Sequence, residues 1–196
     1  AIQMQEKLAI LRDGWRGEGD RWPEIVHNMQ NRIGISSGQM VTGNMGSESR
    51  MNYTMMGDNV NTAARLESSA KQYGIYIQIA DSTYQPVKDK VIVRDLDNVR
   101  VLGKEEPVKV WELISEIGQE PEPYKKILPA YNEALDLYKN QEWAKAIEAF
   151  KASDALEDMF AGRKTNPSRI YIPRCEHFID NPPGDNWDGV WTLTSK

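Results

Sequence analysis

Cysteine, long apolar runs and an excess of basic charge are all lacking in this sequence of 196 residues. Its one cysteine, Cys175, cannot form an internal disulfide, so we expect a buried structural thiol and a reducing, cytoplasmic setting. No apolar run approaches the roughly 18 residues of a membrane-spanning helix, and no signal peptide is recognisable. The net charge of -5 lacks the basic excess that favours nucleic-acid binding.

The composition is that of a folded protein. Hydrophobic residues make up 40% of the chain and charged residues 27%, which predicts a buried core rather than disorder. A chain of 196 residues has room for one medium domain and a smaller one. It begins in helical sequence without an initiator Met, so we expect a piece of a longer protein.

Strand and helix patterns alternate over residues 1–114, which we expect to form one domain. The expected elements are a helix over 1–13, a loop over 14–20, strands over 29–36 and 39–45, a polar turn-rich stretch over 46–52, a helix over 58–73, a strand over 75–79, a short helix over 81–86, and strands over 90–102 and 107–114. The strands on either side of Gly38 are expected to pair as a hairpin, and the polar stretch over 46–52 to form a second, more mobile hairpin. Asp58 or Asn59 is expected to cap the long helix, and Gly74 to end it. This alternation predicts an α/β or α+β layered domain.

A different pattern follows. Pro and Glu cluster within residues 115–123, which predicts a linker. Residues 124–157 carry two apolar stripes at helical spacing, and residues 168–179 are expected to form a third helix. The aromatic and alanine spacing in this tail, residues 124–196, resembles one tetratricopeptide-type helix pair. One pair cannot bury its apolar face alone, so we expect the tail to pack on another part of the protein.

The run from Gly57 to Arg65 carries the strongest indication of chemistry. Asn61 and Arg65 lie four residues apart, so both side chains project from one face of the expected helix. An amide donor and a fixed cation on a rigid element suit a reaction in which negative charge builds up. The alternative is an exposed polar helix face without a function, and the flanking sequence decides between the two.

The flanks contain three further motifs in a fixed order, which are Arg32-Ile33-Gly34-Ile35-Ser36-Ser37-Gly38, Thr42-Gly43-Asn44-Met45-Gly46-Ser47 and Met51-Asn52-Tyr53-Thr54-Met55-Met56. Together with the run from Gly57 to Glu67, they resemble the second half of a class III nucleotidyl cyclase catalytic domain. The resemblance extends from about residue 1 to residue 114. It implies a ferredoxin-like layered sheet whose front part is missing, followed by a small all-α tail of the kind found in some bacterial adenylyl cyclases.

The resemblance also implies a reaction. Cyclases of this class convert a nucleoside triphosphate into its 3′,5′-cyclic monophosphate and pyrophosphate, through in-line attack of the ribose 3′-oxygen on the α-phosphorus. They use two divalent ions, Mg²⁺ or Mn²⁺. Asn61 matches the family asparagine that orients the ribose, and Arg65 matches the arginine that neutralises the α-phosphate as charge develops.

Further positions match the parts of the family site that hold the base and the terminal phosphates. Thr54 matches the residue that reads the purine edge, and a hydroxyl that accepts from the adenine amino group favours ATP. The backbone of Met55 and Met56 is expected to form the wall beneath the base. Lys104, in Leu102-Gly103-Lys104-Glu105-Glu106, matches a lysine on the terminal phosphates. The alternative for Thr54 is a residue that is present because threonine favours a strand. The alternative for Lys104 is an exposed lysine without a binding role.

The two metal-binding aspartates of the family belong to the front half of the domain, and no matching strand exists here. Asp20 follows a glycine but lies in a polar stretch, so we expect it to be solvated. Without the carboxylate pair this segment alone is expected not to catalyse. Family active sites form at a two-fold dimer interface, so the resemblance implies a homodimer that binds ATP and takes its metal ligands from outside this chain.

Adenylate cyclase, which makes cyclic AMP and pyrophosphate from ATP, is the function that the resemblance favours. A guanylyl cyclase is the first alternative, since it carries out the same reaction on another base. A catalytically inactive cyclase-like module for regulation or dimerisation is the second. A tetratricopeptide-like adaptor built on the tail is the third.

Overall fold

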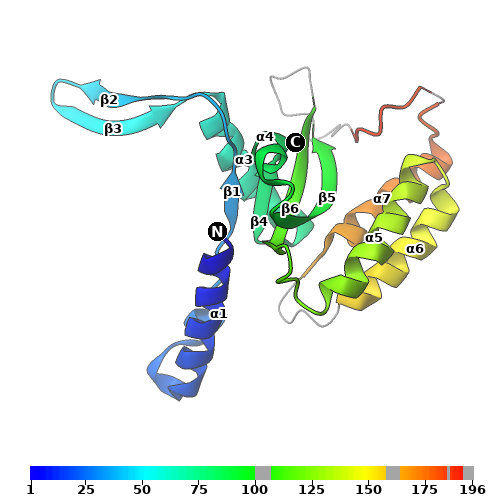
Figure 1. Cartoon of the computed structure of the whole chain (residues 1–196), viewed down its shortest axis with the longest axis horizontal. Helices are drawn as coiled ribbons and strands as arrows, with labels where there is room; N and C mark the ends of the chain where they lie inside the picture. The colour runs from blue at the N-terminus through cyan, green and yellow to red at the C-terminus, as the bar shows by residue number, and fades with distance from the viewer. Residues whose placement is uncertain (100–106, 158–163, 185, 192–196) are drawn as a thin grey trace.

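The computed structural model describes residues 1–99, 107–157, 164–184 and 186–191 (Figure 1). Its elements, in chain order, are α1 (Ile2–Gly17), η1 (Gly19–Arg21), α2 (Glu24–His27), β1 (Ile33–Ile35), β2 (Val41–Ser47), β3 (Arg50–Met56), α3 (Asp58–Tyr73), β4 (Ile77–Ala80), α4 (Asp81–Tyr84), η2 (Gln85–Val87), β5 (Val91–Val99), β6 (Val108–Glu116), α5 (Tyr124–Lys139), α6 (Trp143–Glu157) and α7 (Pro167–Asp180). None of the helices described is both long enough and apolar enough to cross a bilayer.

The centre of the first part is a four-stranded sheet with the order β1-β4-β6-β5. β1 pairs parallel with β4, and the other neighbours are antiparallel. Leu66 and Ala70 of α3 share a buried core cluster with Leu96 of β5 and Val110 of β6, so α3 is fixed against the sheet by apolar packing. The combination of a mixed sheet with packed helices confirms the predicted α+β class.

The first helix is longer than predicted. The expected loop over 14–20 is wrong, because α1 continues to Gly17 and a short 3₁₀ helix follows it. Glycine costs a helix only about 1 kcal/mol, and contacts from outside the helix offset that cost. The Trp15 ring lies 6.1 Å from the Trp22 ring, and Arg16 Nη2 donates to the His27 carbonyl at 2.9 Å. These contacts hold the last turn of α1 in place. Asp20 is exposed, as predicted.

The predicted hairpin around Gly38 is also wrong. β1 uses its edge to pair with β4, whereas β2 pairs with β3 in a separate two-stranded ribbon, whose turn falls inside the predicted polar stretch. The connection from β1 to β2 is held by the side chain of Asn59 instead. Its Nδ2 donates to the Gln39 carbonyl and its Oδ1 accepts from the Ser36 hydroxyl, each at 3.2 Å. A side chain from α3 therefore takes the place of a hairpin turn.

The helix that carries the candidate site has the predicted length, but its start differs. Its N-cap is Gly57, and no side chain caps it, so the prediction that Asp58 or Asn59 is the cap is wrong. Asn59 is already engaged with the connection from β1 to β2. At the other end Gly74 adopts the left-handed conformation, with φ of 65°, and ends the helix as predicted.

In the described part of the tail, three helices pack around an aromatic core (Figure 1). The buried members of this core are Tyr131, Ala134, Leu135, Tyr138, Trp143, Ala146, Phe150, Tyr171, Cys175 and Phe178. Many of the rings meet edge to face, as Tyr138 and Tyr171 do at 4.7 Å, an arrangement that adds to the energy of burial. The likeness of this tail to a tetratricopeptide pair stays a prediction.

Cys175 is fully buried, as predicted, and this burial gives the chain a testable dependence on pH. Burial, followed by the charge of Glu176, raises the pKa of the thiol to about 12 from an ordinary 9.0. The unfolded thiol therefore loses its proton first. The stability that comes from keeping the buried thiol protonated is therefore complete below pH 9. It is lost as the pH rises towards 12, by at most about 1.4 kcal/mol per pH unit.

We expect the free energy of unfolding of the native chain to fall more steeply above pH 9 than that of Cys175→Ala. Urea titrations of both chains at several pH values between 8 and 10 would measure the two slopes. The variant starts from a lower stability because of its cavity, so the slopes are the quantity to compare. Equal slopes would contradict the prediction.

Candidate functional site

The helix α3 has a buried face and an exposed face. Thr62, Leu66 and Ala70 are buried against the sheet, whereas Asn61 and Arg65 are exposed. Asn61 and Arg65 lie one turn apart on this outer face, which confirms the predicted shared face. An amide and a guanidinium thus lie on one exposed face of an element that packing holds rigid.

Gly34 of β1 allows α3 to lie very close to the sheet. A Cβ atom at this position would stand 2.2 Å from the Ala63 carbonyl oxygen and 2.4 Å from the Glu67 amide nitrogen. Backbone atoms on both sides cannot move aside as the end of a side chain can, so only glycine fits. An ion pair of 3.3 Å joins Arg32, the residue before β1, to Glu67 of α3. The position of the helix between Asn61 and Arg65 is therefore fixed by backbone contact.

The predicted base-binding residues lie on the ribbon. Thr54 pairs with Gly43, Met55 with Thr42 and Met56 with Val41. The side chains of all three are exposed. Met56 is followed directly by Gly57, the N-cap of α3, so the ribbon leads into the helix that bears Asn61.

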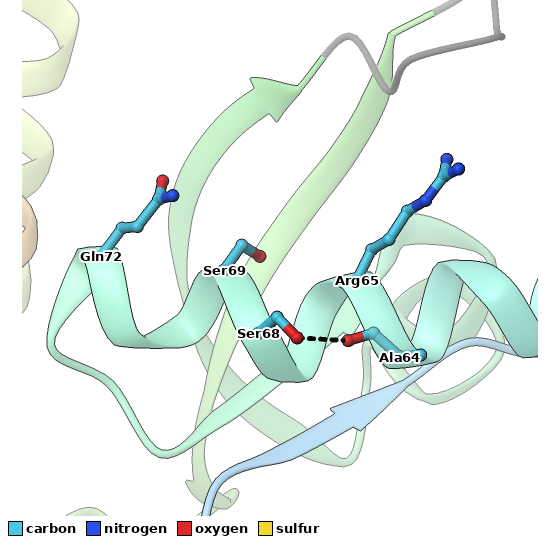
Figure 2. Close-up of a pocket in the computed structure, with 5 residues that line it drawn as sticks. All are labelled: Ala64, Arg65, Ser68, Ser69 and Gln72. Atoms are coloured by element: carbon cyan, nitrogen blue, oxygen red, sulfur yellow. Dashed lines mark hydrogen bonds between the residues drawn. The ribbon is translucent and has the colours of Figure 1, made fainter. Parts of the chain in front are cut away.

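A shallow hollow of about 400 Å³ runs along α3 from Arg65 to Gln72 (Figure 2). Its lining residues are Ala64, Arg65, Ser68, Ser69 and Gln72. Figure 2 shows Arg65, Ser69 and Gln72 pointing to the same side of the helix, whereas the Ser68 hydroxyl donates back to the Ala64 carbonyl at 3.1 Å. Ser69 and Gln72 were absent from the predicted site, although their spacing from Arg65 places them on one face.

One predicted site residue, Lys104, lies outside the described residues. Within the described ranges, no group of three or more His, Cys, Asp or Glu side chains is arranged to hold a metal ion. The described part of this chain therefore does not fit a two-metal centre of its own.

Comparison with known proteins places these observations in a family. The model of the adenylate and guanylate cyclase catalytic domain matches residues 4–115. The terminal-differentiation specific adenylate cyclase of Dictyostelium discoideum is 33% identical over 152 residues, which are 76% of this chain and 7% of that protein. Adenylate cyclase 1 of Rhizobium meliloti is 32% identical over 114 residues, 58% of this chain and 16% of the relative.

Among solved structures, the adenylyl cyclase CyaB from P. aeruginosa is 31% identical, with a TM-score of 0.49 over 61% of this chain and 58% of that one. The chain thus spans a small part of the length of the two curated relatives. The family match, however, covers more than half of this chain and includes every described residue of the candidate site. The chain therefore belongs to the family of class III adenylyl and guanylyl cyclase catalytic domains.

Proposed function

We propose that this chain is the part of an adenylate cyclase that stabilises the transition state, in an enzyme that converts ATP into 3′,5′-cyclic AMP and pyrophosphate. The observation that carries the proposal is the exposed pair of Asn61 and Arg65, one turn apart on a helix whose other face is buried. Two relatives named adenylate cyclases, at 33% and 32% identity, support ATP as the substrate. A substrate of this kind and a reduced thiol at Cys175 suit a cytoplasmic location.

The proposed roles follow from the chemistry of the two side chains. The ribose 3′-oxygen forms a bond to the α-phosphorus, and the bond from that phosphorus to pyrophosphate breaks, with negative charge developing on the phosphate oxygens. Arg65 carries a permanent charge and several N–H donors, which suit those oxygens. Asn61 donates to the ribose and keeps the 3′-oxygen in line for attack. Lys104 is proposed to bind the terminal phosphates.

The rest of the site is proposed to come from outside this segment. Cyclases of this family act as dimers on nucleotides and generally use divalent metals. We assign the ligands of two Mg²⁺ or Mn²⁺ ions to residues outside this segment, because the described residues do not fit them. Both faces of the ribbon carry exposed apolar side chains for a second subunit to cover. Val41, Met51, Tyr53, Met55 and Met56 are each more than half exposed. A homodimer with two equivalent sites fits these features.

Thr54 is proposed to select adenine. Testing this proposal distinguishes an adenylate cyclase from a guanylyl cyclase and from an inactive module. We expect the full-length protein to form cyclic AMP from ATP with a higher kcat/KM than cyclic GMP from GTP. Thr54→Ala is expected to reduce that preference by about tenfold, since one hydrogen bond to the base is lost. Product formation from each nucleotide, measured separately, gives the two values.

Thr42→Ala is the matched control, because Thr42 is an exposed threonine on the neighbouring strand of the same ribbon. It should leave the preference unchanged. A preference for GTP would identify a guanylyl cyclase. The absence of any cyclic nucleotide, in a protein that still dimerises, would favour a regulatory module.

A further inference from the structure

The helix that carries Asn61 and Arg65 is tied at its far end to a buried carboxylate of the sheet. Tyr73, the last residue of α3, donates its hydroxyl to Asp97 Oδ2 at 2.7 Å. Both residues are nearly inaccessible, with 4% and 6% of their surface exposed. Burial, and next the negative charge of Asp97, raises the pKa of the Tyr73 hydroxyl, so this group stays protonated and keeps donating.

The helical tail contacts the same carboxylate oxygen. Arg174 of α7 forms an ion pair with Asp97 Oδ2 at 2.7 Å, and its side chain is only 10% exposed. One turn earlier on α7, the Tyr171 hydroxyl donates to the backbone carbonyl of Leu96, the residue before Asp97. Asp97 is therefore a shared carboxylate that joins the end of α3, through a hydrogen bond, to α7, through an ion pair.

The backbone of the tail also closes on the end of α3. A Cβ atom on Gly74 would lie 1.9 Å from the carbonyl oxygen of Thr165, just before α7. Because Gly74 is left-handed and in backbone contact with the tail, the exit from α3 cannot shift without moving the tail as well.

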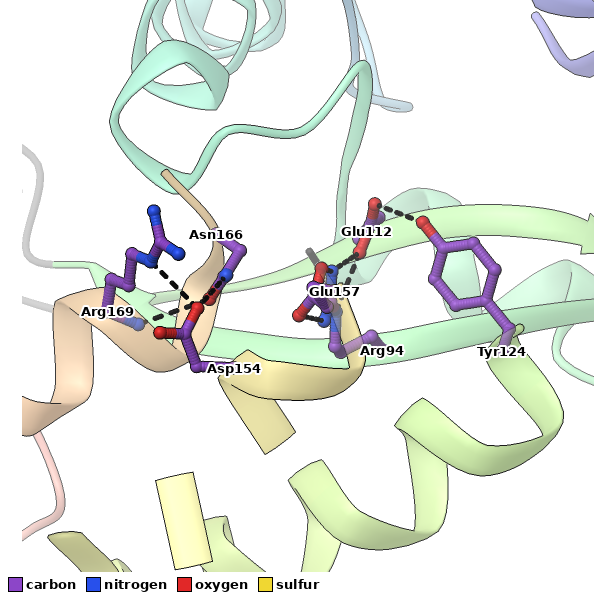
Figure 3. A network of polar contacts seen from close by, with 7 residues as sticks. All are labelled: Arg94, Glu112, Tyr124, Asp154, Glu157, Asn166 and Arg169. Carbon is purple, nitrogen blue, oxygen red and sulfur yellow. Dashed lines mark hydrogen bonds and ion pairs between the residues drawn. The ribbon is translucent and has the colours of Figure 1, made fainter. Parts of the chain in front are cut away.

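A second buried anchor keeps the tail from sliding along the sheet (Figure 3). Arg94 of β5 pairs with Glu112 of β6 and with Glu157 of α6, each at 2.6 Å. The Tyr124 hydroxyl at the start of α5 donates to the other oxygen of Glu112 at 3.3 Å. The sheet, α5, α6 and α7 are thereby joined at two separate places, Arg94 and Asp97.

We propose that the tail positions the transition-state residues, through the link from Arg174 and Asp97 to Tyr73. Tyr73 lies eight residues beyond Arg65, about 12 Å along a rigid helix, so a tilt allowed at this end displaces the guanidinium. A misplacement of about 1 Å at a reacting group can cost about 10²-fold in rate. The inference rests on the proposed function of Arg65. Tyr73, Asp97 and Arg174 act through α3 and are positioning residues.

Tyr73→Phe tests the link with the smallest possible change. In the full-length protein we expect kcat for cyclic AMP formation to fall about tenfold, with KM for ATP within about twofold of its native value. In the 196-residue chain we expect faster hydrogen exchange of the α3 amides around Arg65. The control is Tyr124→Phe, which removes a buried tyrosine hydroxyl from a carboxylate at the same junction but not from α3.

The outcomes separate the two proposals. If Tyr73→Phe and Tyr124→Phe change kcat and α3 exchange alike, the positioning role is wrong and the junction has a merely structural role. If Arg65→Ala itself leaves turnover intact, the proposed function has failed. A large loss from Arg65→Ala with native behaviour of Tyr73→Phe overturns the positioning role alone.

Discussion

Replacement of Arg65 by alanine is expected to lower kcat of the full-length protein by about 10²–10³-fold, with a much smaller change in KM for ATP. The reason is that negative charge on the α-phosphate develops mainly in the transition state. The guanidinium stands on the exposed face of a helix fixed by backbone contact at Gly34, so it is already in place when charge develops on the α-phosphate. Interactions that strengthen only in the transition state raise kcat rather than affinity.

Two further variants sharpen this test. Arg65→Lys keeps the charge but loses the planar set of donors, so it is expected to recover only part of the rate. Lys71→Ala removes an exposed cation from the same helix, outside the predicted site, and is expected to retain native turnover. Steady-state rates of cyclic AMP formation measure all three. Native turnover in Arg65→Ala would remove the basis for the proposed function.

Arg94→Met is expected to have the largest effect on folding, a loss of about 3–5 kcal/mol in the free energy of unfolding of the 196-residue chain. The Arg94 side chain is fully buried between two buried carboxylates, Glu112 and Glu157. Burial lowers the pKa of Arg94, but the two carboxylates raise it by more, so the guanidinium remains charged. Its removal leaves two buried negative groups with no cation between them.

The cause of that loss is open to a direct check. Arg94→Met combined with Glu112→Gln and Glu157→Gln removes the uncompensated charges, and we expect it to recover a large part of the stability. Lys139→Ala breaks a partly exposed pair with Asp95 and is expected to cost less than about 1 kcal/mol. Urea unfolding followed by circular dichroism gives the values. A loss from Arg94→Met no larger than that from Lys139→Ala would contradict the argument.

Local sequence patterns predicted the elements that depend on local forces. The helix from 58 to 73 was predicted because its apolar positions recur at helical spacing and Gly74 ends it. The same spacing placed Asn61 and Arg65 on one face. The pairing of strands was not predicted in the same way, because β1 pairs with β4, which lies beyond the whole of α3. The turn residues near Gly38 do not indicate which strand β1 pairs with.

The contacts of the tail were the least predictable part. Arg94 and Asp97 stand in a strand pattern where polar residues normally face solvent. Their partners, Glu157 and Arg174, lie 60 to 80 residues further along the chain, on helices whose docking no local pattern specifies. Ser69 and Gln72 were missed for a related reason: a hollow depends on what lies around a helix as well as on the helix itself.

The contact between Tyr171 and Leu96 also protects the outer edge of the sheet. β5 is an edge strand, and its ladder to β6 is interrupted by a bulge between Asp95 and Asp97, which leaves Leu96 between the paired positions. Exposed backbone groups on an edge strand are a template for pairing with another molecule. The Leu96 carbonyl accepts a hydrogen bond from the Tyr171 hydroxyl, so α7 covers it. The tail thus occupies a backbone acceptor on this edge that would otherwise be open to pairing with another molecule.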